Sequence, residues 1–551
     1  MNFLKSWTSK NSFIIIGFFA LLFFRFPSFF ESFWYGDENY YLAIAQGIVK
    51  GNQWLYVGAW DNKPPLIYLV YSASVWLFGI QLWPLRVLNF FLGFLVSFLI
   101  YKISKNVFNF NQQISKIAFA ICIFLQSIYF EVTIFNGENL FVPLVLLGFY
   151  FIAPSLLSLA KSNDITSVQT KIMQTQNNNL YYKIFSGGLV WSLAILTKIP
   201  ALAEICWLIL LIYTIWLVQS IGTTKQFKTK FVDFLQNKKV WFSLATLIFS
   251  IALLPILISL IYLANGYFKD LYFAVWQYNN QYYLPENSYP LVLGFTLPFK
   301  SLYFRAFLVV SVLILTFWAF LQGQFQKNNL GQNGFIILNW LAISTFGVFI
   351  AERNYPHYLQ QILPITAILI AWIFSLVKLT ELQISTKIAA VVSALVFYQI
   401  LLTNFTGGSG VLNYFNVDKY WGKNGFNSVI LGSQSLANWQ RSFDANTIDK
   451  TNLLVPIIQK YTNPNDKIFV ASSMPEIYAV SGRLNVYKYV VDYHPLIDIT
   501  EKELAQIIIN EAKLVVIDDS SSLSKKLIPY ISGNFVLEEQ ANSRYSVWVK
   551  K

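Results

Sequence analysis

The sequence has few charged residues and almost no cysteine. Only 12% of its 551 residues are charged, whereas soluble proteins carry roughly 25%, which argues against a water-soluble fold. Its two cysteines, Cys122 and Cys206, both lie in apolar runs, so neither a disulfide framework nor a cysteine-based metal site is expected. The first apolar run also lacks the small-residue cleavage site of a secretory signal peptide. We therefore interpret that run as a membrane span.

Long apolar runs make up much of the chain. Hydrophobic residues account for 56% of it, and runs such as 12–30 and 241–264 approach the ~20 residues that a helix needs to cross a bilayer. We predict a mainly α fold, a polytopic bundle of about eleven transmembrane helices, with a range of roughly nine to thirteen. The stretch 64–79 opens with two prolines and is short for a span, which predicts a re-entrant or interfacial helix. The predicted spans are 12–30, 82–101, 117–135, 139–160, 184–197, 200–218, 241–264, 301–322, 334–351, 358–376 and 388–404.

The positive charge is concentrated in alternate loops. A net charge of +13 would suggest a nucleic-acid partner in a soluble protein, but lysines gathered between spans indicate topology instead. We expect no nucleic-acid binding and place the amino terminus and the lysine-rich loops in the cytoplasm. The outward segments then contain acids, aromatic residues and prolines, and function is expected there: they are 31–81, the turns near 136–138 and 197–200, and the loops 265–300 and 352–358.

The carboxyl-terminal part has the composition of a soluble protein. We predict a transmembrane bundle at 1–404, a linker at 405–446 and an extracytoplasmic α/β domain at 447–551. An odd number of spans places this domain outside. The expected strands are 467–472, 484–491 and 513–519, and the expected helices are 449–460, 500–512 and 523–531.

Two adjacent acids follow the first span. Asp37 and Glu38 lie in WYGDENYY (34–41), and in a partly desolvated place a carboxylate's pKa rises and the group can act as a general base. Helix capping by Asp37 is the alternative. Glu138 lies at the edge of the apolar region, where acids are functional candidates, and pairing with a nearby lysine is its alternative.

Four cationic or potentially cationic side chains are predicted on the same face. They are Lys63 in WDNKPPL, Lys198 in LTKIPAL, and Arg353 and His357 in AERNYPHYLQQILP. Together they would suit an anionic lipid phosphate, although any lysine could instead snorkel toward headgroups and His357 could be structural. A sugar on a lipid phosphate has a stable anionic leaving group, so one carboxylate base and several cations would suffice. A glycoside hydrolase would need a second, protonated acid.

These motifs, in this order, resemble the C-type membrane glycosyltransferases. The similarity is greatest to the bacterial relatives of the protein O-mannosyltransferases and to the lipid A aminoarabinose transferase, and it covers about 12 to 404. It implies a bacterial cell membrane, a monosaccharide donor on polyprenyl phosphate, an extracytoplasmic acceptor hydroxyl on protein, lipid or glycan, and transfer with inversion.

The resemblance also implies roles for single residues. Asp37 matches the catalytic base with Glu38 as its companion, and Glu138 matches the second acidic motif, where many relatives have Asp. Lys63 and Lys198 are expected to bind the donor phosphate, and Arg353 and His357 lie in the loop that closes over the donor. No metal site is carried over, because KPPL lacks the acidic neighbour that helps bind metal in the aminoarabinose transferase; a divalent cation is left open. The residues expected in the substrate pocket are Trp34, Tyr40, Tyr41 and Tyr358.

Two other functional classes remain open at this stage. A transporter or flippase of a lipid-linked or anionic substrate would also have many spans and intramembrane charges, although it usually shows paired repeats. A non-catalytic membrane scaffold with a partner-binding tail is the second. If the chain is an enzyme, the outward tail is a candidate for acceptor recognition.

Overall fold

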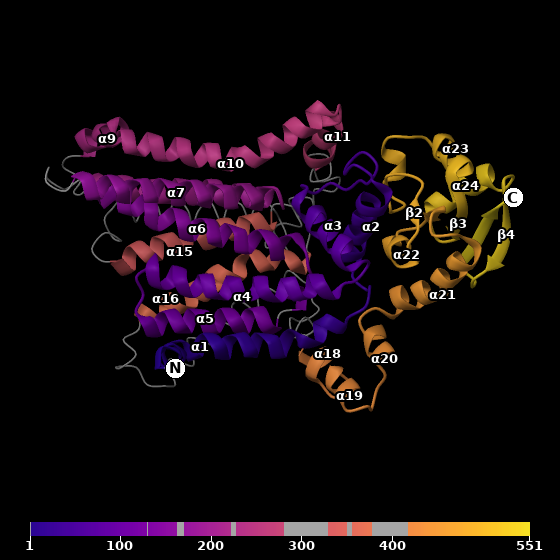
Figure 1. The fold of residues 1–551 in the computed structure, drawn as a ribbon, viewed down its shortest axis with the longest axis horizontal. Helices are drawn as coiled ribbons and strands as arrows, with labels where there is room; N and C mark the ends of the chain where they lie inside the picture. The colour runs from indigo at the N-terminus through magenta and orange to yellow at the C-terminus, as the bar shows by residue number, and fades with distance from the viewer. Residues whose placement is uncertain are drawn as a thin grey trace, which may run out of the picture.

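Long helices lie side by side in a bundle, and a small sheet lies beyond one end of it (Figure 1). The computed structural model describes residues 2–128, 130–161, 170–221, 227–279, 329–349, 355–376 and 417–551. The bundle helices are α1 (Asn2–Arg25), α4 (Trp83–Asn106), α5 (Gln112–Ile128), α6 (Gly137–Lys161), α7 (Thr170–Ile195), α8 (Pro200–Ile221), α10 (Lys238–Ala264), α15 (Asn329–Phe349) and α16 (Leu363–Leu376).

Several of these helices are suited to a bilayer. Among the described residues, six segments are long and apolar enough to cross a membrane. In the most apolar window of α10 only 11% of residues are buried, and Trp241, Phe249 and Leu260 are among its exposed side chains. Lipid rather than water matches such a surface, so the chain is a multi-pass membrane protein. The number of spans stays a prediction, because 301–322 and 388–404 lie outside the described residues.

Some predicted spans have different boundaries in the structure. The segment 117–135 is not one span, since α5 ends at Ile128 and the 3-10 turn η2 (Phe130–Val132) follows. The segment 358–376 begins as the 3-10 helix η7 (Pro356–Ile362) and becomes α-helical only in α16. Pro356 sits in the first turn of η7, where its fixed φ is tolerated.

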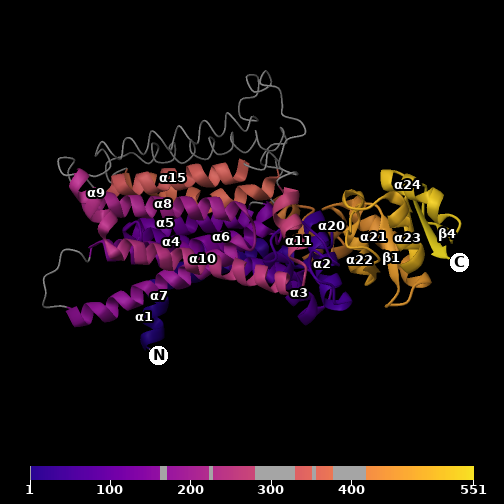
Figure 2. The ribbon, with the colours of Figure 1, turned by 90° about the horizontal axis from the view of Figure 1, so that it is seen from above.

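The described parts of the loops predicted to face outward gather at one end of the bundle; of 265–300 and 352–358 these are 265–279 and 355–358. Helices α2 and α3 lie between the bundle and the sheet in both views (Figures 1 and 2). Helix α3 confirms the short helix expected at 64–79, and α9 lies at the opposite end (Figure 1). The short elements of these two ends are η1 (Phe26–Phe30), α2 (Gly36–Gly51), α3 (Leu66–Phe78), α9 (Phe227–Gln236), α11 (Phe268–Tyr272) and the π-helical turn η5 (Phe273–Gln277).

The carboxyl-terminal sheet has the strand order β2-β1-β3-β5-β4. Strand β1 pairs in parallel with β2 and β3, while β5 is antiparallel to β3 and β4. The strands are β1 (Lys467–Ala471), β2 (Leu484–Asn485), β3 (Ala512–Asp518), β4 (Phe535–Gln540) and β5 (Tyr545–Lys550). The helices of this part are α18 (Val417–Trp421), α19 (Phe426–Ile430), α20 (Leu436–Arg441), α21 (Ala445–Tyr461), α22 (Pro475–Ser481), η9 (Pro495–Ile497), α23 (Glu501–Glu511) and α24 (Ser522–Ile531).

The sequence predicted two of these strands correctly. Strands β1 and β3 match 467–472 and 513–519 closely, whereas β4 and β5 were missed. The predicted strand 484–491 is wrong beyond Asn485. There the Lys488 carbonyl accepts a hydrogen bond of 3.0 Å from the Trp60 N–H of the outer loop, so this segment bonds to the bundle instead of extending the sheet.

Both faces of the sheet are packed. Phe469 of β1 and Val515 of β3 share a core with α23 and α24. Their neighbours Ile468 and Val516 belong to a second core, which continues through α21 and α22 to Tyr41 of α2. Because alternate strand residues point to opposite faces, apolar packing fixes the sheet against the outer loop 31–81.

Candidate functional site

A cavity of about 300 Å³ lies where the outer end of the bundle meets the carboxyl-terminal part. It brings together side chains from segments that are far apart in the sequence. Six residues predicted for the site line it: Asp37, Tyr40, Lys63, Lys198, His357 and Tyr358. The other lining residues are Tyr35, Gly36, Asp61, Asn62, Pro64, Ile199, Pro200, Tyr278, Asn279, Tyr355, Tyr493 and His494.

Asp37 reaches the cavity from the first turn of α2. The residue at the N-cap position is Tyr35, without a side-chain capping bond, so the interpretation of Asp37 as a helix cap is wrong. Burial by itself raises the pKa of the Asp37 carboxyl, but Lys63, His357 and Lys198 outweigh burial and hold that pKa below its usual value. The raised pKa expected from the sequence is therefore wrong for Asp37. The group is ionised at neutral pH, as a general base must be.

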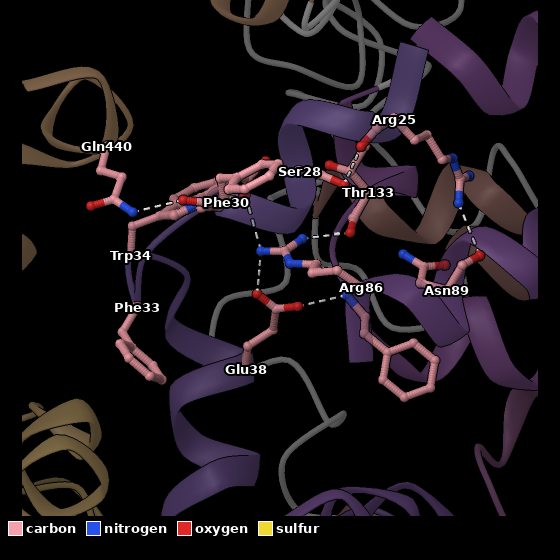
Figure 3. Close-up of polar contacts among 12 residues, drawn as sticks. Arg25, Ser28, Phe30, Phe33, Trp34, Glu38, Arg86, Asn89, Thr133 and Gln440 are labelled. Atoms are coloured by element: carbon pink, nitrogen blue, oxygen red, sulfur yellow. Dashed lines mark hydrogen bonds and ion pairs between the residues drawn. The ribbon is translucent and has the colours of Figure 1, made fainter. Parts of the chain in front are cut away.

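Glu38 points away from the cavity into a buried ionic network (Figure 3). Its Oε2 lies 2.6 Å from Nη2 of Arg86, and its Oε1 accepts a 2.7 Å bond from the Phe135 N–H. Arg86 also bonds Glu31 at 3.0 Å and the Thr133 carbonyl. Burial raises the pKa of Glu38 to about 7, against the opposing effect of Arg86. Glu38 thus anchors α2 beneath Asp37 and does not face the site.

Lys63 lies beside Asp61, an acid that is not among the predicted site residues. Its Nζ is 3.6 Å from Oδ2 of Asp61, which also accepts from the Tyr68 hydroxyl. Burial disfavours the ammonium, but Asp61 and, more weakly, Tyr41 and Asp37 raise the pKa of Lys63 well above its usual value. The expectation that KPPL lacks an acidic neighbour is therefore wrong: in WDNKPPL the acid stands two residues before the lysine.

Lys198, which lies just before α8, forms a buried ion pair with Glu138 in the first turn of α6. Its ammonium also lies 4.1 Å from the centre of the Tyr358 ring. The competing interpretation of Glu138 as the partner of a lysine is therefore confirmed. Only 7% of Lys198 is exposed, so it does not snorkel to the surface. Burial lowers the pKa of Lys198, while Glu138 opposes that shift.

Helix η7 holds His357 and Tyr358 against the site. Gln360 donates to the Glu131 carbonyl and Gln361 donates to Oε2 of Glu204, both at 2.6 Å. Nδ1 of His357 is 3.2 Å from the Tyr35 hydroxyl. These bonds fix η7 from both sides. Arg353, predicted to act with His357, lies outside the described residues.

Two aromatic residues predicted for the pocket lie behind its wall. Trp34 donates from Nε1 to Oε2 of Glu31 at 2.8 Å. The Tyr41 hydroxyl donates to Oδ1 of Asn136 at 3.3 Å, and the Lys63 ammonium lies 4.9 Å from the centre of the Tyr41 ring. Neither residue lines the cavity. Tyr41 contacts Lys63, which does, whereas Trp34 bonds Glu31, which does not.

Four lining residues that were not predicted from the sequence come from two distant segments. Tyr278 and Asn279 follow η5, and Tyr493 and His494 precede η9. No local spacing connects them to Asp37. The packing of the carboxyl-terminal part on the outer loop brings Tyr493 and His494 to the cavity, and hydrogen bonds between Asn279 and Asn62 hold the segment after η5 there. Within the described ranges, no three His, Cys, Asp or Glu side chains converge as a metal-ligand set.

No protein-family model matches the chain, and no curated protein matches it by sequence. By structure it is similar to ArnT from Cupriavidus metallidurans in the apo state, at 13% identity and a TM-score of 0.50, over 98% of each chain. An Archaeoglobus fulgidus oligosaccharyltransferase tethered to an acceptor peptide gives 12% identity and a TM-score of 0.45, over 99% of this chain and 75% of that one. AglB from the same organism, in complex with an inhibitory peptide and a dolichol-phosphate, gives 12% identity and a TM-score of 0.44, over 93% of this chain and 70% of that one.

The likeness to ArnT concerns the fold. At 98% coverage of both chains, the bundle and the carboxyl-terminal sheet together share the fold of ArnT. The predicted helical membrane bundle with a carboxyl-terminal sheet is thereby confirmed, and the number of spans stays a prediction.

Proposed function

We propose that this protein is a membrane glycosyltransferase that moves a monosaccharide from a polyprenyl-phosphate carrier to a hydroxyl acceptor. One observation carries the proposal: Asp37, Lys63, Lys198 and His357 line the same cavity although they come from four separate segments. An ionised carboxylate next to cations suits a reaction in which a hydroxyl loses its proton and a phosphate leaves. The fold is shared with ArnT, a lipid A aminoarabinose transferase, and this supports the proposal that the protein is a glycosyltransferase.

The residues take distinct roles in this reaction. Asp37 removes the proton of the acceptor hydroxyl, whose oxygen attacks the anomeric carbon from the side opposite the phosphate. The new C–O bond forms as the bond to the phosphate oxygen breaks, so the configuration inverts. Lys63 and Lys198 stabilise the negative charge of the departing polyprenyl phosphate. That phosphate is a weak base and needs no proton, which explains why a single carboxylate suffices.

The size of the cavity favours a small transferred group. Ligand pockets usually span about 300–1,000 Å³, and this one, at about 300 Å³, lies at the lower limit. One sugar ring with its phosphate fits such a volume better than an oligosaccharide does. The acceptor is a protein, lipid or glycan hydroxyl.

We also infer the orientation in the membrane. The lysine-rich segments that the structure describes, such as 102–116 and 227–239, lie at the end of the bundle opposite the cavity (Figure 1), and positive loops remain cytoplasmic. The amino terminus is then cytoplasmic, while the cavity and the domain 447–551 are extracytoplasmic, on the outer face of a bacterial cell membrane.

The direct test is an assay with defined donors. Purified protein in detergent is incubated with a panel of polyprenyl-phosphate monosaccharides, and the release of polyprenyl phosphate is followed together with transfer of labelled sugar. We expect one donor to be consumed with stoichiometric release of carrier. If no donor is consumed, while vesicles containing the protein move a lipid-linked sugar across the bilayer, the transporter alternative replaces the proposal.

The Lys198→Ala variant should raise the KM for the donor roughly 10–100-fold, because a charge-assisted bond to phosphate contributes about 1.5–3 kcal/mol. The inhibition constant of free polyprenyl phosphate should rise by the same factor. Lys467→Ala is the control, since Lys467 pairs with Glu511 on the surface of the carboxyl-terminal domain. The double variant Lys198→Met/Glu138→Gln tests whether the rise in KM comes from the unpaired charge of Glu138 and not from the loss of Lys198. An unchanged inhibition constant in both variants would exclude Lys198 as a phosphate ligand.

The Lys63→Met variant should move the acid limb of the pH–rate profile to higher pH. Lys63 is the strongest of the groups that lower the pKa of Asp37, so that pKa should be higher in the variant than in the wild type. A carboxylate base is active above its pKa and loses activity as the pH falls through it. The loss should therefore begin at higher pH than in the wild type. The double variant Lys63→Met/Asp61→Asn also removes the charge that Asp61 would keep without its lysine partner. If the acid limb stays in place in both variants, Lys63 does not lower the pKa of Asp37.

A further inference from the structure

The carboxyl-terminal part supplies one wall of the cavity. Tyr493 and His494 line it together with Tyr40 of α2 and Tyr278, which follows η5. Nδ1 of His494 lies 3.2 Å from the Tyr40 hydroxyl, and Nε2 lies 3.2 Å from the Tyr278 hydroxyl. One imidazole thus joins three segments of the chain at the site.

The hydrogen bonds define how this imidazole is protonated. The Tyr40 hydroxyl donates its single hydrogen to the Trp60 carbonyl at 3.1 Å. Nδ1–H of His494 must then donate to the Tyr40 oxygen, and Nε2 accepts from Tyr278. Burial lowers the pKa of His494 to about 4, so the ring is neutral at pH 7. With both nitrogens engaged, His494 fixes its neighbours and presents no charge to a ligand.

The rings held in this way form a neutral half of the cavity. Tyr493 is 64% exposed, and its ring centre lies 4.3 Å from that of His494. Beside them Asn62 donates from Nδ2 to Oδ1 of Asn279 at 2.9 Å, and Asn279 donates to the Asn62 carbonyl at 2.6 Å. Aromatic faces and side-chain amides make up this wall, in contrast with the charged side chains of Asp61, Lys63 and Lys198; of these, Asp61 acts most strongly on Tyr40 and His494.

We propose that this neutral half, formed by Tyr40, Tyr278, Tyr493, Asn62 and Asn279, is the subsite for a sugar ring. A pyranose has an apolar C–H face, which packs on aromatic rings, and a rim of hydroxyls, which bond to amides. The phosphate is drawn to the two lysines and the uncharged ring to the aromatic wall. This inference rests on the proposed function and assigns the carboxyl-terminal part a direct contact with substrate. The ring belongs to the donor or to a glycan acceptor.

Tyr493 is the residue to test, because its exposure makes its truncation compatible with folding. Tyr493→Ala should raise the KM for one sugar substrate about 3–10-fold, and Tyr493→Phe, which keeps the ring, should restore most of the loss. The inhibition constant of polyprenyl phosphate, which has no sugar, should stay unchanged in Tyr493→Ala. Tyr530→Ala is the matched control, since Tyr530 is 47% exposed on α24 and does not line the cavity.

The outcomes separate the two proposals. A rise in donor KM alone assigns the ring to the donor, and a rise in acceptor KM alone assigns it to the acceptor. If the wild type transfers sugar and Tyr493→Ala has unchanged KM values for both, the subsite is overturned while the proposed function stands. A rise in the polyprenyl phosphate inhibition constant equal to the rise in donor KM would also overturn it. If the wild type transfers no sugar from any donor, the proposed function itself fails.

Discussion

Replacing Asp37 by Asn should lower the kcat for sugar transfer by about 10²–10⁴-fold, the range that a general base contributes. Asn keeps the shape of the side chain but cannot take a proton from the acceptor hydroxyl. Asp37 lines the cavity, and nearby cations keep its pKa low, so its carboxylate is ionised at neutral pH. The measurement is the initial rate of labelled sugar transfer at saturating donor and acceptor.

Two comparisons make this result interpretable. Glu38→Gln changes the adjacent acid, which faces Arg86 instead of the cavity. This variant should have a lower melting temperature than the wild type, with little change in kcat. Asp449→Asn changes an exposed acid paired with Arg441 and should affect neither. Sugar transfer at near wild-type rate by a folded Asp37→Asn protein would remove Asp37 from the mechanism. Transport or scaffolding, by contrast, would be expected to survive the substitution.

The Arg86→Met variant should destabilise the protein by about 3–5 kcal/mol, because removing one partner of a buried ion pair leaves an uncompensated charge. Arg86 has a fully buried side chain and bonds both Glu31 and Glu38. Glu31 in turn accepts from the Tyr420 hydroxyl of α18. The network therefore links α4, α2 and the segment leading to the carboxyl-terminal part, and its loss should lower the melting temperature in detergent.

A triple variant distinguishes unpaired charge from lost packing. Arg86→Met/Glu31→Gln/Glu38→Gln removes all three charges, and much of the stability should return, since neutral replacements of buried ion networks are often tolerated. Arg441→Ala is the control, because the Arg441–Asp449 pair is exposed and such pairs contribute little. A melting temperature for Arg86→Met equal to that of the wild type would mean that the network does not hold this end of the bundle.

The sequence determined the features that depend on local signals. Runs of apolar residues identified the bundle helices and the short helix at 64–79, because a span needs a continuous hydrophobic stretch. Alternating lysine-rich and aromatic loops indicated which loops share an end of the bundle. Acids and cations within those loops gave Asp37, Lys63, Lys198 and His357, all of which line the cavity.

Tertiary structure alone decided which side chains face the site and in what state. Adjacent helical residues point about 100° apart, so only the rotation of α2 could place Asp37 in the cavity and Glu38 on Arg86. The pairing of Lys198 with Glu138, and the wall built by Tyr493 and His494, arise between segments that are remote in sequence. A side chain's charge and partners depend on the groups packed around it, and the folded chain supplies those groups from every part of its length.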